Sequence, residues 1–349
     1  MIRLTMLPAE DGDCLLLEYG NDAFTRRILF DGGRRGTYER IKPLLAGLGG
    51  RIDLLVVTHV DQDHILGVLA LLDDRERPVE FGDVWFNGFD HLHDREAFSA
   101  VDGELLTTAL LTQRLPWNKA FDGRSVETGH PLTWFDDGSS MEVLAPDRRL
   151  LEGLITTWKT KCQEAGLIPG VDPLEREPVP GVERFGPIDV DDVDALAATP
   201  FKRDGSPTNP TSIGLLFEFE GTRIVFTGDA DDPRLVASLR PRAEAEGGRL
   251  RIDALKVAHH GSAKNLSNDL LGLLDCGRYL ISTNGRVHGH PDDIAIARIL
   301  KHGGARKDLV FNYRERAANW DLDSLRDEFG YRVLAPAPTD EDGFVTLEF

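Results

Sequence analysis

The sequence has few cysteines, a shortage of basic residues and no long apolar run, and each shortage excludes a class of protein. Its 349 residues include only 3 cysteines, which are widely separated. They form neither a disulfide framework nor a thiolate zinc site, and a reducing cytoplasm fits them best. There are 40 basic and 59 acidic residues, so the net charge is −19. This negative charge disfavours broad, non-specific nucleic-acid binding. No apolar run approaches the roughly 20 residues that span a bilayer, so we expect no membrane association. The first residues, interrupted by Arg3 and Pro8, do not read as a secretory signal.

What is present is an alternation of apolar strands and helices in two similar halves. The first half predicts strands at 14–19, 26–30 and 52–58 and helices at 38–48 and 65–74; the second predicts a hairpin at 212–231 and strands at 253–262 and 278–285. The strands outnumber the helices and tend to end in polar loops. Two such halves predict two sheets packed face to face with helices outside.

Residues 150–208 interrupt this rhythm. They are rich in proline and acidic residues, and one helix is expected at about 151–165. We interpret the segment as an insertion or cap over the site, within a single domain that spans residues 1–349.

The strongest functional signal lies at 58–64, where THVDQDH follows directly on an apolar strand. Ligands at a strand end are held by a rigid sheet, while the loop lets them converge. His59 and Asp61 can reach one cation, and Asp63 and His64, at the start of the next helix, can reach a second. Imidazole and carboxylate together suit zinc, manganese or iron. The alternative is a polar loop that happens to be rich in histidine and aspartate.

This segment resembles the H-x-[HD]-x-D-H signature of the metallo-β-lactamase superfamily, with Asp61 where many members have histidine. Together with FTGDAD (226–231), VAHHGS (257–262) and HGHP (288–291), it resembles the metallo-β-lactamase-like domain of ComEC-type competence proteins and related stand-alone bacterial hydrolases. The resemblance runs from residue 1 to about 300. It implies an α/β fold, a four-layer αββα sandwich, with two divalent metal ions, zinc or manganese.

The same resemblance implies roles for residues outside the first motif. Asp31 matches an aspartate that supports the site, and Asp229 matches the carboxylate that bridges two metals. His259 and His260 match a histidine pair. Alternation along a strand would point them to opposite faces, so we expect one to be a ligand and the other to act on the substrate or leaving group. His290 matches the final histidine ligand, whereas His288 is expected nearby or in solvent.

Many superfamily members carry one more histidine between the first and the bridging motifs. The candidates here are His91, His93 and His130, although ComEC-like members do without it. Four polar residues are predicted to contact the substrate: Asn209, Ser212, Ser262 and Lys264.

These residues predict a hydrolase in which a water bridging two cations loses its proton near neutral pH and attacks the substrate. Asp63, Asp229 and His260 are the expected catalytic residues. The expected metal ligands are His59, Asp61, Asp63, His64, Asp229, His259, His260 and His290. The favoured substrate is a phosphodiester, in a small phosphorylated molecule or a single-stranded nucleic acid. The alternatives are an ester, lactone or peptide cleaved by the same site, or a metal-bound scaffold without catalysis.

Overall fold

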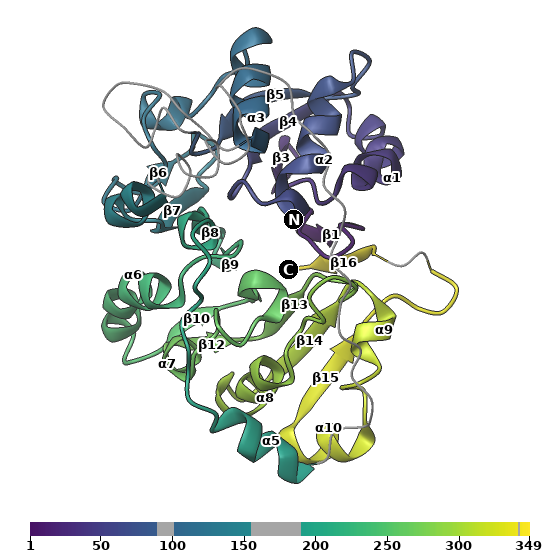
Figure 1. Ribbon diagram of the computed structural model, residues 1–349, viewed down its shortest axis with the longest axis vertical. Helices are drawn as coiled ribbons and strands as arrows, with labels where there is room; N and C mark the ends of the chain where they lie inside the picture. The colour runs from purple at the N-terminus through teal and green to yellow at the C-terminus, as the bar shows by residue number, and fades with distance from the viewer. Residues whose placement is uncertain (89–100, 155–189, 341–342) are drawn as a thin grey trace.

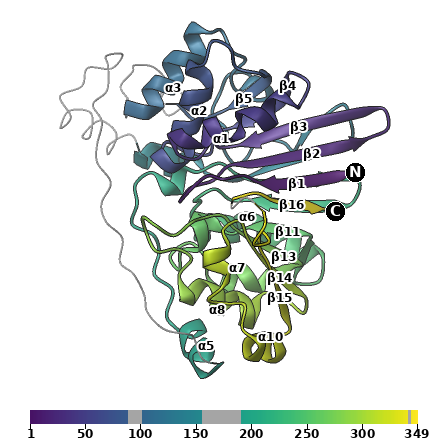
Figure 2. The ribbon, with the colours of Figure 1, turned by 90° about the vertical axis from the view of Figure 1, so that its right-hand side faces the viewer.

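The computed structural model describes residues 1–88, 101–154, 190–340 and 343–349. Two sheets lie face to face, and helices cover the outer face of each (Figures 1 and 2). None of the helices in these ranges combines the length and the apolar character that crossing a bilayer requires.

The first sheet has six strands in the order β16-β1-β2-β3-β4-β5. Its strands are β1 (Ile2–Met6), β2 (Leu15–Asn21), β3 (Phe24–Phe30), β4 (Arg51–Val56), β5 (Glu80–Trp85) and β16 (Val345–Glu348). Its helices are α1 (Arg35–Ala46), α2 (Gln62–Asp73) and α3 (Val101–Thr112). Because β3, β4 and β5 are parallel, the residues that follow β3 and β4 emerge at one edge. The last strand, β16, pairs with β1, which brings the two ends of the chain together (Figure 2).

The second sheet has eight strands in the order β15-β14-β13-β11-β9-β8-β7-β6. Its strands are β6 (Thr133–Trp134), β7 (Ser140–Ala145), β8 (Gly214–Phe219), β9 (Thr222–Phe226), β11 (Ala254–Lys256), β13 (Arg278–Ile281), β14 (Lys307–Phe311) and β15 (Tyr331–Leu334). Strands β9, β11, β13, β14 and β15 run parallel to one another, so the loops after β9, β11 and β13 also meet at one edge.

Several smaller elements complete the two halves. They are α5 (Val190–Ala197), α6 (Asp232–Ala245), α7 (Asn268–Gly272), α8 (Asp293–His302), α9 (Arg314–Ala317), α10 (Asp323–Phe329), the paired strands β10 (Leu250–Ile252) and β12 (Leu274–Cys276), and the short 3-10 helices η2 (Lys119–Phe121), η3 (Asn209–Thr211) and η4 (Ala258–Gly261).

Three separate apolar cores confirm the four-layer arrangement. One lies between the sheets and includes Leu4 and Phe30 from the first with Phe217 and Leu280 from the second. A second joins α1, α2 and α3 to the outer face of the first sheet. A third joins α6, α7 and α8 to the outer face of the second sheet. The αββα sandwich expected from the sequence is therefore the architecture of the protein.

The segment at 150–208 is described only in part. The helix expected at about 151–165 lies mostly outside the described residues. The described helix α5 packs against α8, and its Val193 and Ala197 belong to the outer core of the second sheet. The chain then returns toward the junction of the sheets, where η3 begins.

Candidate metal centre

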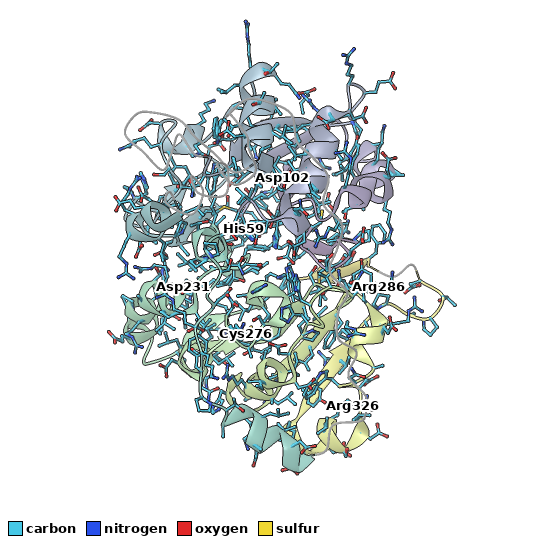
Figure 3. The ribbon with its side chains drawn as sticks, viewed as in Figure 1. His59, Asp102, Asp231, Cys276, Arg286 and Arg326 are labelled. Carbon is cyan, nitrogen blue, oxygen red and sulfur yellow. The ribbon has the colours of Figure 1, made fainter. Side chains whose placement is uncertain are left out.

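The candidate metal centre lies where strand ends of both sheets meet, and Figure 3 shows His59 near the middle of the molecule. His59 and His64 come from the loop after β4 and the first turn of α2, whereas Asp229 follows β9. Gly228 allows these loops to approach: it has φ +51, and a Cβ atom there would lie 2.9 Å from the Cβ of Thr58. A larger side chain at 228 would therefore push Asp229 away from the histidines.

Four histidine side chains converge on the Asp229 carboxylate, and they divide between its two oxygens. The Nε2 atoms of His64 and His260 lie 3.5 and 3.7 Å from Oδ1. The Nε2 atoms of His59 and His259 each lie 3.7 Å from Oδ2. One carboxylate therefore faces two pairs of imidazole nitrogens, one pair for each oxygen.

Two carboxylates of the THVDQDH motif complete the two groups. Asp63 Oδ2 lies 3.3 Å from His260 Nε2 and 3.8 Å from His64 Nε2. Asp61 Oδ2 lies 3.6 Å from His59 Nε2. We call His64, His260 and Asp63 the closed half of the site, because their side chains are 0%, 1% and 13% exposed.

The remaining three residues form what we call the open half. The side chains of His59, His259 and Asp61 are 0%, 20% and 35% exposed. Two of the three therefore reach solvent, and this half is the accessible side of the site.

In the closed half, the second nitrogen of each imidazole is occupied by an acceptor. His260 Nδ1 lies 2.9 Å from the carbonyl oxygen of Ser282, and a carbonyl can only accept, so this nitrogen carries the hydrogen. His64 Nδ1 lies 2.8 Å from Asp31 Oδ2. The two Nε2 atoms lie only 3.3 Å apart, and two unprotonated nitrogens would not adopt this spacing without a cation or proton between them.

The open half follows the same rule. Thr58 donates its only hydroxyl hydrogen to Asp31 Oδ2 at 2.8 Å, so it accepts from His59 Nδ1, 3.0 Å away. His259 Nδ1 lies 3.0 Å from Asn265 Oδ1. All four imidazoles thus keep Nδ1 for support and turn Nε2 toward Asp229, the arrangement that second-shell partners impose on metal-binding histidines.

The donor set fits divalent cations. Donor atoms bound at about 2.0–2.1 Å in tetrahedral geometry lie roughly 3.3 Å apart, and the spacings within the two halves run from 3.3 to 3.8 Å. His59 Nε2 and Asp229 Oδ1 are buried and have no hydrogen-bond partner among the described residues. Since buried polar atoms are nearly always paired, these two atoms mark places that a cation would fill.

Charge in the site points the same way. Burial would lower the pKa of His260, but the carboxylates of Asp229, Asp13 and Asp63 raise it to about 10. Burial would raise the pKa of Asp63, but His64 and His260 lower it. Without metal the imidazoles therefore hold protons against the carboxylates, and a divalent cation would have to displace those protons on binding.

Asp31 occupies the supporting position that the sequence resemblance implies. Its Oδ1 accepts from the backbone N–H of Thr58 at 2.7 Å, and its Oδ2 contacts the Thr58 hydroxyl and His64 Nδ1. It thereby ties the end of β4 to the first turn of α2, and both histidines of the first motif are held through it.

Sequence reasoning missed a buried ion pair behind the closed half. Lys256 Nζ lies 2.8 Å from Asp13 Oδ2, and both side chains are 1% exposed. Asp13 Oδ1 lies 3.3 Å from His260 Nδ1. Burial raises the pKa of Asp13, but Lys256 and His260 bring it down to about 2. Asp13 also belongs to a compact group of metal-capable side chains with His64, Asp229 and His260.

The sequence feature that could have marked Asp13 as part of the site is the neighbouring Gly12, which has no side chain. A Cβ atom on Gly12 would lie 1.7 Å from the carbonyl oxygen of Asp63, so the 12–13 turn packs directly on the start of α2. A carboxylate next to a glycine immediately before an apolar strand was visible in the sequence, but its partner Lys256 lies far along the chain.

The residues predicted to contact substrate fall into two groups. Asn209 is buried, and its Nδ2 lies 3.2 Å from His259 Nδ1. Ser212 is also buried, and its Oγ accepts from the backbone N–H of Asp229 at 3.1 Å. Ser262 is buried and its Oγ accepts from the backbone of Lys264, whereas the Lys264 side chain is exposed. Ser212 and Ser262 thus support backbone, and Asn209 borders the open half.

The other candidate histidines that the structure describes lie outside the group around Asp229. His290 stacks edge-on beside His259, with ring centroids 5.2 Å apart, and its Nδ1 lies 3.3 Å from Asp292 Oδ1. His288 is exposed, and His130 packs on Phe121. His91 and His93 lie outside the described residues.

The prediction that His259 and His260 point to opposite faces of a strand is wrong. Strand β11 ends at Lys256, and His259 and His260 lie in η4 with φ of 48° and 55°. This left-handed backbone removes strand alternation, so both side chains turn to the same carboxylate instead of to opposite faces.

No family model matches this sequence, and neither does any curated protein. Among solved structures, it is similar to the crystal structure of the short form of human tRNase Z, with a TM-score of 0.42 and 12% identity over 99% of this chain and 98% of that one. It is also similar to a diphosphatase from the PhnP family, with a TM-score of 0.40 and 13% identity over 100% of this chain and 98% of that one. At this level of similarity the fold rests on the two sheets and three cores described above, and the chemistry rests on the residues themselves.

Proposed function

We propose that this protein is a hydrolase that uses two divalent cations to cleave a phosphodiester. One observation carries the proposal: four histidine Nε2 atoms face the two oxygens of Asp229, while every Nδ1 is held by a supporting group. A structural histidine cluster would satisfy its nitrogens within the protein. This one turns four Nε2 atoms toward a single carboxylate and leaves His59 Nε2 and Asp229 Oδ1 without a partner among the described residues.

Each half of the site would hold one cation. His59, Asp61 and His259 would bind the first together with Asp229 Oδ2, and the closed half would bind the second with Asp229 Oδ1. Both members of the histidine pair are then ligands, one for each cation. Two imidazoles and two carboxylates per cation suit zinc or manganese.

When bound, two such cations lower the pKa of a water between them to near neutrality and stabilise negative charge on the substrate oxygen. The chain's own residues orient the reaction. Asp61 is the most exposed carboxylate of the site, and Thr208 fixes it by donating to its Oδ2 at 2.9 Å. Asp63 and Asp229 are the buried carboxylates that orient the attacking water. His290, beside the open half but turned toward Asp292, is proposed to contact the substrate, which would replace its expected role as a ligand.

The substrate class rests on the resemblance to ComEC-type domains and on the carboxylate-rich site. A net charge of −19 repels long polyanions, so a small phosphodiester or a single-stranded segment is the proposed substrate. The site draws residues from both sheets, which supports a single domain over residues 1–349 with the insertion at about 150–208. Cys14 and Cys276 are buried free thiols, and a cytoplasmic setting belongs to the same proposal.

Metal analysis and a substrate panel test the proposal together. Protein purified without chelator should carry close to two metals per chain. With Mn²⁺ or Zn²⁺ added, it should cleave a bis-nitrophenyl phosphate diester at mildly alkaline pH. A metal content near zero that Zn²⁺ and Mn²⁺ do not raise would contradict the metal centre. Turnover of a carboxylic ester, lactone or peptide in place of the diester, abolished by Asp63→Ala, would keep the metal centre and contradict the substrate class.

A further inference from the structure

The segment 199–209, which we call the strap, connects the outer helix layer to the metal centre. It begins just after α5, which packs against α8, and ends in η3 beside His259. Three of its side chains lie at the site: Asp204, Thr208 and Asn209. The open half therefore depends on a stretch of chain that belongs to neither of the two sheets.

A buried arginine fastens the start of the strap. Arg298, on α8, is 1% exposed. It donates to the carbonyl oxygen of Thr199 at 2.9 Å and to those of Ala263 and Leu266 at 2.8 and 2.7 Å. Its guanidinium also lies over the ring of Phe201. A single side chain thus joins the strap to the loop that follows the histidine pair.

Asp204 lies midway along the strap, against the outer nitrogen of His259. Its Oδ2 is 3.5 Å from His259 Nδ1 and accepts from Asn209 Nδ2 at 2.7 Å and from Asn265 Nδ2 at 3.4 Å. Its Oδ1 accepts from the backbone of Ser206 at 3.0 Å. Asn265 Oδ1 is the nearer acceptor of His259 Nδ1, at 3.0 Å, so Asp204 supports the imidazole both directly and through the Asn265 amide that it holds.

We propose that Asp204 is a positioning residue that orients the His259 imidazole toward the first cation. Arg298 holds the strap in place and thereby positions Asp204. The inference rests on the proposed metal centre. A carboxylate behind a metal-binding imidazole fixes its tautomer and orientation and makes it a better ligand. The other three histidines take their support from Thr58, Asp31 and Ser282, which lie next to strand ends. Loss of the strap contacts should therefore weaken the binding of the cation in the open half and leave the binding of the other cation unchanged.

The test compares four variants with the wild-type protein: Asp204→Ala, Asp204→Asn, Arg298→Met and, as a control, Lys202→Ala, which changes an exposed residue of the same strap. Both metal dissociation constants are measured by competition with a chelator. The coupled spectrum of two neighbouring Mn²⁺ ions is followed by electron paramagnetic resonance.

Asp204→Ala should raise the metal dissociation constant of the open half about 10- to 100-fold and leave that of the closed half unchanged. The coupled Mn²⁺ signal should become that of a single ion. Asp204→Asn should lose less, because an amide oxygen can still accept from Asn209 Nδ2 and face His259 Nδ1. Arg298→Met should weaken the same site as Asp204→Ala, and Lys202→Ala should match wild type.

Unchanged constants in Asp204→Ala, or equal weakening of both sites, would overturn the inference while leaving a two-metal wild-type protein intact. Wild-type protein that binds no metal would overturn the proposed function itself, and this inference with it. Arg298 is buried, so its loss destabilises the fold as well as the strap. If Arg298→Met fails to fold, the two Asp204 variants alone decide the outcome.

Discussion

The two halves of the proposed metal centre use the same types of side chain but are built from different parts of the chain. In the closed half, His64 and His260 are almost fully buried and are supported by Asp31 and by the Asp13–Lys256 ion pair. In the open half, His259 is partly exposed and depends on the strap. One half is thus part of the sandwich, and the other is completed by a segment laid against it.

The difference in burial between the two halves suits two separate requirements of a hydrolytic site. A buried set of ligands held by strand ends keeps its geometry when substrate arrives and leaves. A half that reaches solvent can exchange its water for substrate oxygens. We therefore expect the closed half to retain its cation longer and the open half to meet the substrate.

The largest expected effect comes from removing the carboxylate that the halves share. Asp229→Ala should lose at least one cation and all measurable turnover, because both imidazole pairs lose the negative charge between them. The sheets should survive, since Asp229 follows the end of β9. Elemental analysis with far-ultraviolet circular dichroism measures both points. Full metal content and normal turnover would show that the halves are independent of Asp229.

The next largest effect is expected from breaking the Asp13–Lys256 ion pair behind the closed half, which should lower the free energy of unfolding. Lys256→Met removes the nearest positive charge from the buried Asp13 carboxylate, and breaking a buried pair in this way costs about 3–5 kcal/mol. Urea unfolding of the metal-free protein measures the loss. The double variant Asp13→Asn/Lys256→Met is the control and should recover part of it. A single variant as stable as wild type would mean that the pair does not support the closed half.

The smallest effect is expected outside both halves, at Asp232 in the first turn of α6. Burial, with Asp231 and Asp269 nearby, raises the pKa of this carboxyl from 3.8 to about 6. A pKa raised by folding contributes stability below the unfolded value of 3.8, and that contribution is lost as pH rises through 6.

Asp232→Asn keeps an acceptor for the backbone N–H of Ser267 and removes the charge. The variant should therefore be more stable than wild type by about 1–3 kcal/mol near neutral pH, with the difference vanishing below about pH 4. Unfolding of the metal-free proteins at both pH values measures it. An equal difference at the two pH values would show that the charge of Asp232 is not the cause.

The sequence was sufficient for those parts of the site that follow directly on strands. The run from Thr58 to His64 comes at the end of β4, and Asp229 comes at the end of β9, so an apolar run followed by polar ligands was enough to place them. The packing of two sheets also followed from strands that end in polar loops in both halves of the chain.

The supporting groups could not be predicted because their partners are distant in sequence. Asp13 matters through Lys256 and His260, and Asp204 matters through His259, and neither pairing leaves a local pattern. The orientation of the histidine pair depends on left-handed backbone at His259 and His260, which no alternation rule anticipates. The sequence therefore located the side chains that converge on Asp229 but not the groups that orient them.

The most direct test of the central claim is the release of metal from the wild-type protein to a chelator, followed with time and counted per chain. Two cations that share Asp229 in unequal halves should leave in two phases of one metal each, and His259→Ala should remove only the faster phase. Release of a single metal per chain, or of two in one phase that His259→Ala and His260→Ala alter equally, would contradict the account.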